Sequence, residues 1–369
     1  MNNILYYGGP ILTMADPLYV EAVLIQKGKI VCCGPLEQVE AQADAETQRI
    51  DLQGRTLMPS FIDPHGHLSH VADAQAYADL SGCTTMEELG QRLVEWVRQN
   101  QVEKGRWVIG RGYDHNDLPG GQHPTAALLD AFLPDHPVLL SHTTGHMGVV
   151  NTRGLRELGI SSDTPDPAGG HIGRDAQGCL TGYLEENALI LRTRQIPRPT
   201  TEERLKNLAK AQQLYLSYGI TTCQDGKVGA ADFDFLCQAA KSGALQLDTV
   251  AYADMQNNEE LLQEQASYRN YQRNLRLGGY KIFLDGSPQG RTAWMSKPYL
   301  GGRPDYRGYP IYTDDAVRQF CETALRNNVQ LLAHCNGDAA AEQFIGAYEK
   351  ALACSRSKND VRPVMIHAQ

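Results

Sequence analysis

Pro59–His67 reads PSFIDPHGH, a short apolar run that ends in two histidines one residue apart. Side chains at positions i and i+2 of a strand lie on the same face. His65 and His67 can therefore reach one cation from the end of one strand, and imidazole nitrogen suits Zn²⁺ and similar divalent ions. The alternative is a pair of strand-end histidines that bond only to backbone groups.

Three further ligand-type residues stand within or just after short apolar runs: Lys281, His334 and His367. A (β/α)8 barrel builds its active site in this way, from the carboxyl ends of several strands. We therefore expect these residues to converge on the His65–His67 pair.

Strands and helices alternate regularly after residue 218. The expected strands are 219–225, 247–252, 280–285, 329–334 and 362–367, with helices near 231–242, 258–273, 314–327 and 338–353. Such alternation predicts a parallel sheet. Together with the strand before His65, it predicts an α/β fold with a (β/α)8-type barrel in which about six of the eight strands are present.

The part of the chain before residue 215 follows another pattern. Residues 1–58 contain short runs typical of antiparallel strands, which predicts the N-terminal portion of a small β-sandwich. The barrel would occupy 59–369, with an α/β insertion at about 68–215, where the alternation breaks. Within it, Thr85 and Glu88 form a capping-box pattern that predicts a helix over 85–100.

Composition narrows the class of partner. The chain has 369 residues and a net charge of −9, which argues against nucleic acid or an anionic membrane surface as a partner and favours solubility. The expected partner is a small-molecule substrate. Nine cysteines without a CxxC spacing indicate a reducing compartment. No signal-peptide pattern and no apolar run of about 18 residues occurs, so the cytoplasm is expected. A homo-oligomer is compatible with this composition.

Seven motifs occur in one order along nearly the whole chain: PSFIDPHGH, GRGYDHNDLPGGQHPT, GHMGVVNTRGL, GITTCQDG, KIFLDGSPQGRTA, LLAHCNGDAA and IHAQ. This ordered set resembles the YtcJ-like branch of the amidohydrolase superfamily. The resemblance implies a metal-dependent barrel with one or two Zn²⁺ ions, a β-sandwich, and an insertion after the first barrel strand.

The resemblance also implies roles for the residues at the strand ends. His65 and His67 match the first-strand metal ligands, and His334 and His367 match those of the fifth and sixth strands. Lys281 matches the fourth-strand lysine, which is expected to be carboxylated and to bridge two metals. The family's eighth-strand aspartate has no counterpart before Gln369, so the chain is interpreted as truncated.

Lys281 also has a simpler interpretation. It lies in an apolar strand, and a buried unmodified lysine is costly unless it is paired. A salt bridge to Asp285 or Asp225 would provide such a pair. Carboxylation would instead make the side chain an anion with two oxygens that suit two cations.

The remaining candidates lie on loops. His146, in the insertion, matches a residue that hydrogen-bonds the substrate or its oxyanion, so Lys281, His334 and His146 are the expected catalytic residues. Asp114, His146, Asp285 and Arg291 are the expected substrate-binding residues. A solvated loop is the alternative for Asp114 and its neighbour His115, a loop turn for His146, and a structural ion pair for Arg291, which could otherwise clamp a carboxylate.

The expected reaction is hydrolysis of carbon–nitrogen bonds other than peptide bonds, in an amide, formamide or cyclic amide, by a metal-activated hydroxide. Two alternatives stay open. One is a truncated, inactive remnant that binds a metal or ligand. The other is a lactone or ester hydrolase on the same scaffold.

Overall fold

The computed structural model describes residues 3–288, 291–300, 305–355 and 359–369. It divides into two compact units: one comprises Met1–Pro64 with Tyr215–Thr222, and the other His65–Leu214 with Cys223–Gln369. The boundaries that the sequence suggests, at residue 58 and at 68–215, stay predictions.

The N-terminal sheet has the strand order β3-β2-β1-β4. Its elements are β1 (Ile4–Leu12), β2 (Tyr19–Gln26), β3 (Lys29–Gly34), α1 (Leu36–Glu40) and β4 (Gln48–Asp51). β1 and β3 pair antiparallel with β2, as expected, but β4 runs parallel to β1. A parallel pair needs a crossover rather than a tight hairpin, and the segment that carries α1 supplies it. Leu5, Leu24 and Val39 are buried in the core of this sheet.

The insertion forms a sheet of its own, with the order β10-β11-β9-β8-β7-β6. Its strands are β6 (Ala78–Asp79), β7 (Val108–Tyr113), β8 (Val138–His142), β9 (Met147–Val150), β10 (Gly170–Arg174) and β11 (Leu180–Glu186). β6, β7 and β8 are parallel, whereas β9, β10 and β11 join by antiparallel pairs. The carboxyl ends of β7 and β8 therefore lie at the same edge of the sheet.

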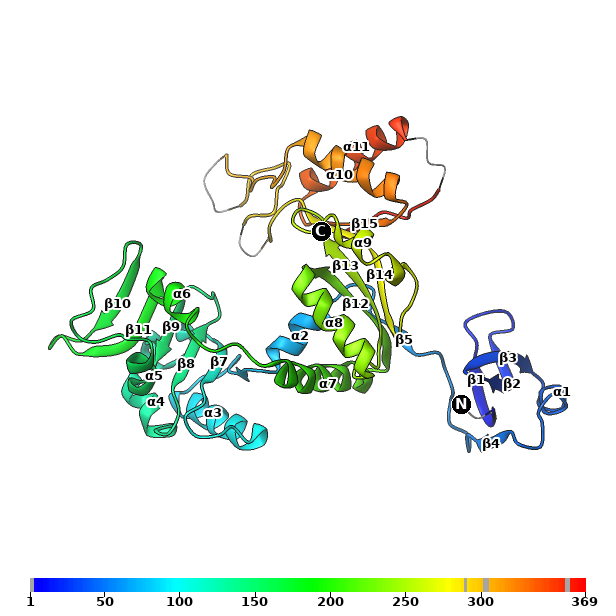
Figure 1. Ribbon diagram of the computed structural model, residues 1–369, viewed down its shortest axis with the longest axis horizontal. Coiled ribbons are helices and arrows are strands. Elements are labelled where there is room, and N and C mark those ends of the chain that lie inside the picture. Colours follow the sequence, from blue (N-terminus) through cyan, green and yellow to red (C-terminus); the bar gives the residue numbers. More distant parts are fainter. Residues whose placement is uncertain (1–2, 289–290, 301–304, 356–358) are drawn as a thin grey trace. The chain divides into compact units, whose positions relative to one another are not determined.

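Short helices accompany this sheet. They are α3 (Met86–Asn100), η1 (His115–Asp117), η2 (Pro119–Gly121), α4 (Ala126–Phe132), α5 (Thr152–Glu157) and α6 (Asn187–Thr193). The helix α2 (Leu68–Ala74) lies instead with the third sheet described below (Figure 1), where the Ser69 amide donates to the Asp225 carboxylate. The predicted cap of α3 is present: the Thr85 hydroxyl accepts from the Glu88 amide at 3.1 Å. The Glu88 carboxylate accepts from the amide of Thr84 rather than that of Thr85.

The third sheet has the order β16-β15-β14-β13-β12-β5 (Figure 1). Its strands are β5 (Phe61–Ile62), β12 (Ile220–Val228), β13 (Asp248–Asp254), β14 (Leu275–Phe283), β15 (Gln330–Cys335) and β16 (Val364–His367). The pairs β5–β12, β13–β14, β14–β15 and β15–β16 are parallel. The fold is therefore α/β with a curled parallel half-barrel sheet and additional β-sheets, as the sequence predicts.

The helices associated with this sheet follow the predicted alternation, with one exception. They are α7 (Thr201–Ser217), α8 (Ala230–Ser242), α9 (Leu261–Glu264), η3 (Ala266–Arg269), α10 (Asp314–Asn327) and α11 (Asp338–Cys354). The single helix expected over 258–273 is wrong, because α9 and η3 replace it. Arg273 and Asn274 then adopt left-handed φ angles of 50° and 70°, which turn the chain into β14.

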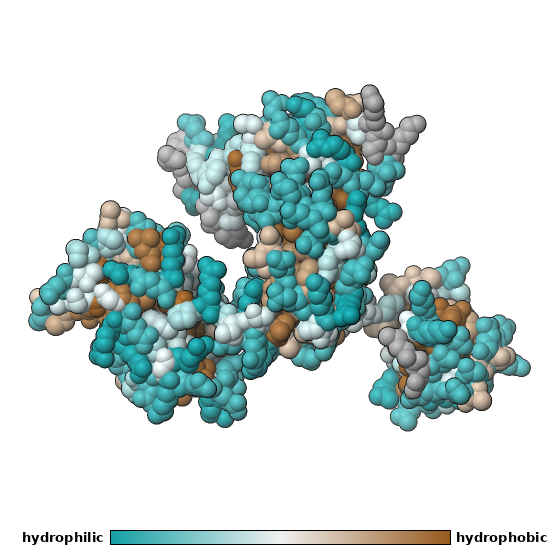
Figure 2. Space-filling view, viewed as in Figure 1, coloured by the Kyte–Doolittle hydropathy of each residue, from teal (hydrophilic) through white to brown (hydrophobic). Residues whose placement is uncertain are grey.

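Burial explains why the strands of the third sheet have continuous apolar sequences. Leu277, Tyr280 and Ile282 of β14 are each at most 2% exposed, as are Leu331 and Leu332 of β15. A parallel sheet covered on both faces buries its side chains in this way. The visible faces carry mostly hydrophilic residues, with scattered hydrophobic side chains (Figure 2). Among the described residues, no helix has the length and apolar character needed to span a bilayer.

Candidate active site

Four histidines meet at the carboxyl edge of the third sheet. The ring centroid of His65 lies 5.4 Å from that of His67 and 5.5 Å from that of His367, and His367 lies 4.7 Å from His334. His65 and His67 follow β5, His334 lies in β15, and His367 ends β16. The amide of Gly226 in β12 donates to the Gly66 carbonyl at 2.8 Å, which holds the first pair in place.

The surroundings of His67 favour its neutral imidazole form. Burial, followed by the charges of His70, His65, Lys281 and His367, lowers the pKa of His67 to about 4. Its buried Nδ1 has no hydrogen-bond partner within the described parts of the chain. A neutral ring with an unused nitrogen is the form that binds a metal ion.

Lys281 is fully buried, and its Nζ has no hydrogen-bond partner among the residues that the structure describes. Burial lowers the pKa of this amine to about 8. The salt bridge to Asp285 or Asp225 does not occur within the described ranges. An amine in this setting is costly as an ammonium ion, which favours a neutral or modified side chain.

Asp225 of β12 lies beside this group. It forms a β-bridge with His67, and its Oδ2 accepts from the Ser69 amide at 3.0 Å. Burial raises the pKa of Asp225 to about 7, and Oδ1 has no hydrogen-bond partner in the described residues. Among the described residues, three buried polar atoms, on His67, Lys281 and Asp225, are thus left without hydrogen bonds. The imidazole nitrogen and the carboxylate oxygen are ligand types that fit a divalent cation.

His334 is oriented by the loop after β14. Its Nε2 lies 2.9 Å from the Gly286 carbonyl and 3.1 Å from Asn336 Nδ2, which donates to the same carbonyl. In the tautomer in which Nε2 donates to that carbonyl, Nδ1 keeps the lone pair that a cation needs. The Asp285 carboxylate, buried beside His334, accepts from the amides of Trp294, Asn336 and Gly337 at 2.9, 2.9 and 2.7 Å. These hydrogen bonds hold the loop after β14 against the start of α11.

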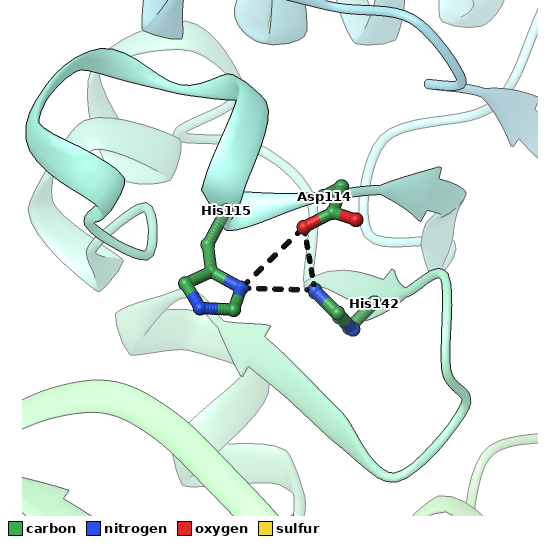
Figure 3. Close-up of side chains that lie close together, drawn as sticks. All are labelled: Asp114, His115 and His142. Atoms are coloured by element: carbon green, nitrogen blue, oxygen red, sulfur yellow. Dashed lines mark hydrogen bonds and ion pairs between the residues drawn. The ribbon is translucent and has the colours of Figure 1, made fainter. Parts of the chain in front are cut away.

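The insertion brings a second group together (Figure 3). The Nδ1 of His115 lies 3.1 Å from the Nε2 of His142, and the Asp114 Oδ1 lies 3.4 Å from His142 and 3.6 Å from His115. The three residues come from the carboxyl ends of β7 and β8, which are neighbouring parallel strands in which Tyr113 pairs with His142. Their ligand atoms lie close enough together to hold one metal ion.

Aromatic rings form the wall of this second group. The ring of His123 stacks on His115 with centroids 4.2 Å apart, and its Nδ1 lies 3.0 Å from the Tyr113 hydroxyl. Burial, followed by the charges of His115 and His142, lowers the pKa of His123 to about 4. The His123 ring is therefore uncharged at neutral pH.

The roles of the other predicted loop residues, His146 and Arg291, stay predictions. His146 is largely exposed in the turn before β9, and its Nδ1 lies 3.1 Å from the Glu186 carboxylate. The amide of Arg291 donates to the Pro288 carbonyl. Gln289 and Gly290 of the same loop lie outside the described residues.

Sequence reasoning did not propose His142, His123 or His70 as members of these groups. His142 had a detectable signal, because it ends an apolar strand just as Asp114 and His115 follow the preceding one. His70 stacks on His67 with centroids 5.1 Å apart, one helical turn after the HxH motif. His123 lies in a loop between strands and had no such signal.

Histidines and a buried lysine at the carboxyl edge of a parallel half-barrel are an arrangement that suits a metal-dependent hydrolase. The sequence profile of the Amidohydrolase family matches residues 48–369, and the chain therefore belongs to this family. Within it, the chain falls in the YtcJ-like branch, because it is 30% identical to YtcJ of Bacillus subtilis (strain 168) over 375 residues, which cover 99% of this chain and 68% of YtcJ.

Other relatives agree with this assignment. N-substituted formamide deformylase of Arthrobacter pascens is 26% identical over 89% of this chain and 62% of its own length. An uncharacterized metal-dependent hydrolase from Pyrococcus furiosus has a TM-score of 0.73 at 27% identity, covering 95% of this chain and 70% of that one. The chain spans about two thirds of the length of these relatives.

Proposed function

We propose that the protein hydrolyses carbon–nitrogen bonds of small amides, formamides or cyclic amides at the carboxyl edge of the third sheet. The observation that carries this proposal is the meeting of His65, His67, His334 and His367 around the buried Lys281. The printed name of the deformylase from Arthrobacter pascens makes N-substituted formamides the first substrates to test.

One or two divalent ions, with Zn²⁺ as the first candidate, would be held by the four histidines and Lys281. Such an ion activates water and polarises a carbonyl group. In the tautomer in which His334 Nε2 donates to the Gly286 carbonyl, Nδ1 keeps its lone pair for the ion, and the low pKa of His67 keeps its ring neutral.

Lys281 is proposed to be carboxylated. Carboxylation requires an uncharged amine, and burial lowers the pKa of this amine to about 8. The product would be an anion with two oxygens, which would offset the cost of the buried site and could bridge two ions. His146 is proposed to hydrogen-bond the substrate, and Asp285 to keep His334 and its loop in place. A reducing, cytoplasmic location is proposed from the odd number of dispersed cysteines.

The experiment compares the Zn²⁺-loaded chain with His65→Ala/His67→Ala on matched formamide, amide, lactone and ester substrates. His171→Ala is the control, because His171 forms an exposed pair with Asp166 in the insertion. The proposal predicts formamide or amide turnover that the double variant loses and the control keeps. Turnover of the esters and lactones alone would favour the ester hydrolase, and metal binding without turnover of any substrate would favour a non-catalytic metal-binding protein.

A further inference from the structure

We propose that Asp114, His115 and His142 form a second divalent-cation site, built entirely within the insertion and independent of the barrel histidines. This goes beyond the proposed hydrolase function, which uses none of these three residues as metal ligands.

The spacing of the three ligand atoms supports the site. Ligands bound at about 2.0–2.1 Å with tetrahedral angles lie roughly 3.3–3.4 Å from one another. The separations here are 3.1, 3.4 and 3.6 Å. The three atoms therefore already form the triangular face of a tetrahedral site, and shifts of a few tenths of an ångström would suffice to accept an ion.

The surrounding residues hold these ligands in place. The His142 side chain is 2% exposed, and its Nδ1 lies 3.0 Å from the Thr144 hydroxyl, which can accept from that nitrogen and direct Nε2 to an ion. Asp114 Oδ1 accepts from the Asn116 amide at 2.9 Å and from its side chain at 2.8 Å. Stacking on His123 fixes the plane of the His115 ring.

A simpler arrangement has the same contacts. A neutral His142 could donate one proton from Nε2 to His115 or Asp114, with Nδ1 accepting from the Thr144 amide at 3.2 Å. In that arrangement a single proton occupies the place that the cation would take. The two arrangements differ in measurable metal binding, which decides between them.

The donor set indicates the kind of ion. Two imidazole nitrogens and one carboxylate oxygen suit Zn²⁺ and similar borderline ions rather than Ca²⁺ or Mg²⁺, which prefer oxygen ligands. Three protein ligands leave one coordination position open. We expect water or a small anion to occupy that position.

The test is a titration of the full chain, stripped by a chelator, with Co²⁺ and Zn²⁺ in a His65→Ala/His67→Ala background. The proposal predicts one equivalent bound per chain, with a cobalt absorption spectrum that is characteristic of nitrogen and oxygen ligands. Asp114→Asn and His142→Gln should each weaken binding at least tenfold, whereas His171→Ala, which alters the exposed His171–Asp166 pair of the same sheet, should not.

Asp114→Asn keeps the side-chain volume and the oxygen that accepts from Asn116. This variant therefore still tests the metal site if His142→Gln fails to fold. Equal thermal unfolding of the stripped Asp114→Asn and parent chains shows that the fold is kept. Unchanged affinity in Asp114→Asn, or no bound cation in the parent background, would overturn the proposal. A separate measurement tests the barrel site. If that site binds no metal, the chains with and without the His65→Ala/His67→Ala changes will have equal metal content.

Discussion

The rings of His334 and His367 meet with centroids 4.7 Å apart and planes at 81°, although the sheet register pairs His367 with Cys335 rather than with His334. Regular alternation would place these two rings on opposite faces of the sheet. His367 and Ala368 adopt left-handed φ angles of 75° and 51°, which end the alternation at this position. The departure of β16 from regular geometry thus coincides with the meeting of two candidate ligands.

We expect His367→Ala to lower the affinity of the barrel site for Zn²⁺ at least tenfold, or about 1.4 kcal/mol, because one imidazole ligand is lost. Competition with a chromophoric chelator measures this change. His171→Ala should leave the affinity unchanged. Equal affinity of the His367→Ala variant and the wild type would remove His367 from the set of ligands.

Lys281→Met should stabilise the metal-free chain in CO₂-free buffer by about 1–3 kcal/mol at pH 7, because it removes a buried ammonium group that has no hydrogen-bond partner among the described residues. The folded-state pKa of about 8 lies below the ordinary 10.5, so the cost of the charge is fully present below pH 8 and is relieved as the pH rises towards 10.5. Urea unfolding at pH 7 and pH 10 measures both effects.

Lys206→Met is the control for this variant, because Lys206 forms an exposed pair with Glu202 at 2.9 Å, and we do not expect its replacement to stabilise the chain. A loss of stability in Lys281→Met at pH 7 would mean that the lysine already has a favourable partner.

Asp225→Asn should change how the stability of the metal-free chain depends on pH. Burial raises the folded-state pKa of Asp225 from 3.8 to about 7. The contribution of this group to the free energy of unfolding is therefore most favourable below pH 3.8. It is lost as the pH rises to 7, by up to about 1.4 kcal/mol per pH unit. The variant should lack this decline and be more stable than wild type at pH 8. Asp166→Asn should give the opposite sign, because hydrogen bonding by His171 lowers the pKa of Asp166. Parallel pH profiles for wild type and Asp225→Asn would refute the assignment.

Asp285→Asn should destabilise the chain by about 1–3 kcal/mol, because one carboxylate oxygen becomes an amide nitrogen that cannot accept. Oδ1 now accepts from the Asn336 amide and Oδ2 from those of Trp294 and Gly337, so at least one backbone amide loses its acceptor. Thermal unfolding measures the loss. Glu95→Gln, which alters an exposed pair with Arg98, should change stability by less than about 0.5 kcal/mol. If Asp285→Asn kept its stability while substrate KM rose, Asp285 would act on the substrate rather than on the loop.

The strand ends could be predicted from the sequence because their signals are local. A short apolar run precedes His65, another ends at His334, and a third contains Lys281, so each stretch shows both the strand and the candidate ligand. The parallel pairing of these strands then follows from their alternation with helices.

Other features depend on contacts that are distant in the sequence. The group of Asp114, His115 and His142 requires β7 and β8 to be parallel neighbours, whereas the break in strand–helix alternation in the insertion gave no strand order. The parallel pairing of β4 with β1 and the left-handed turn at His367 likewise follow from tertiary packing. No short stretch of sequence encodes these relationships.

The most direct test of the barrel site is the metal content of the purified chain, determined by elemental analysis, beside that of His65→Ala/His67→Ala. The difference between the two chains isolates the ions that these histidines hold, whatever the insertion binds. We predict that the double variant loses one or two equivalents of divalent metal per chain. Equal metal content in both chains would contradict a metal site at the carboxyl edge of the third sheet.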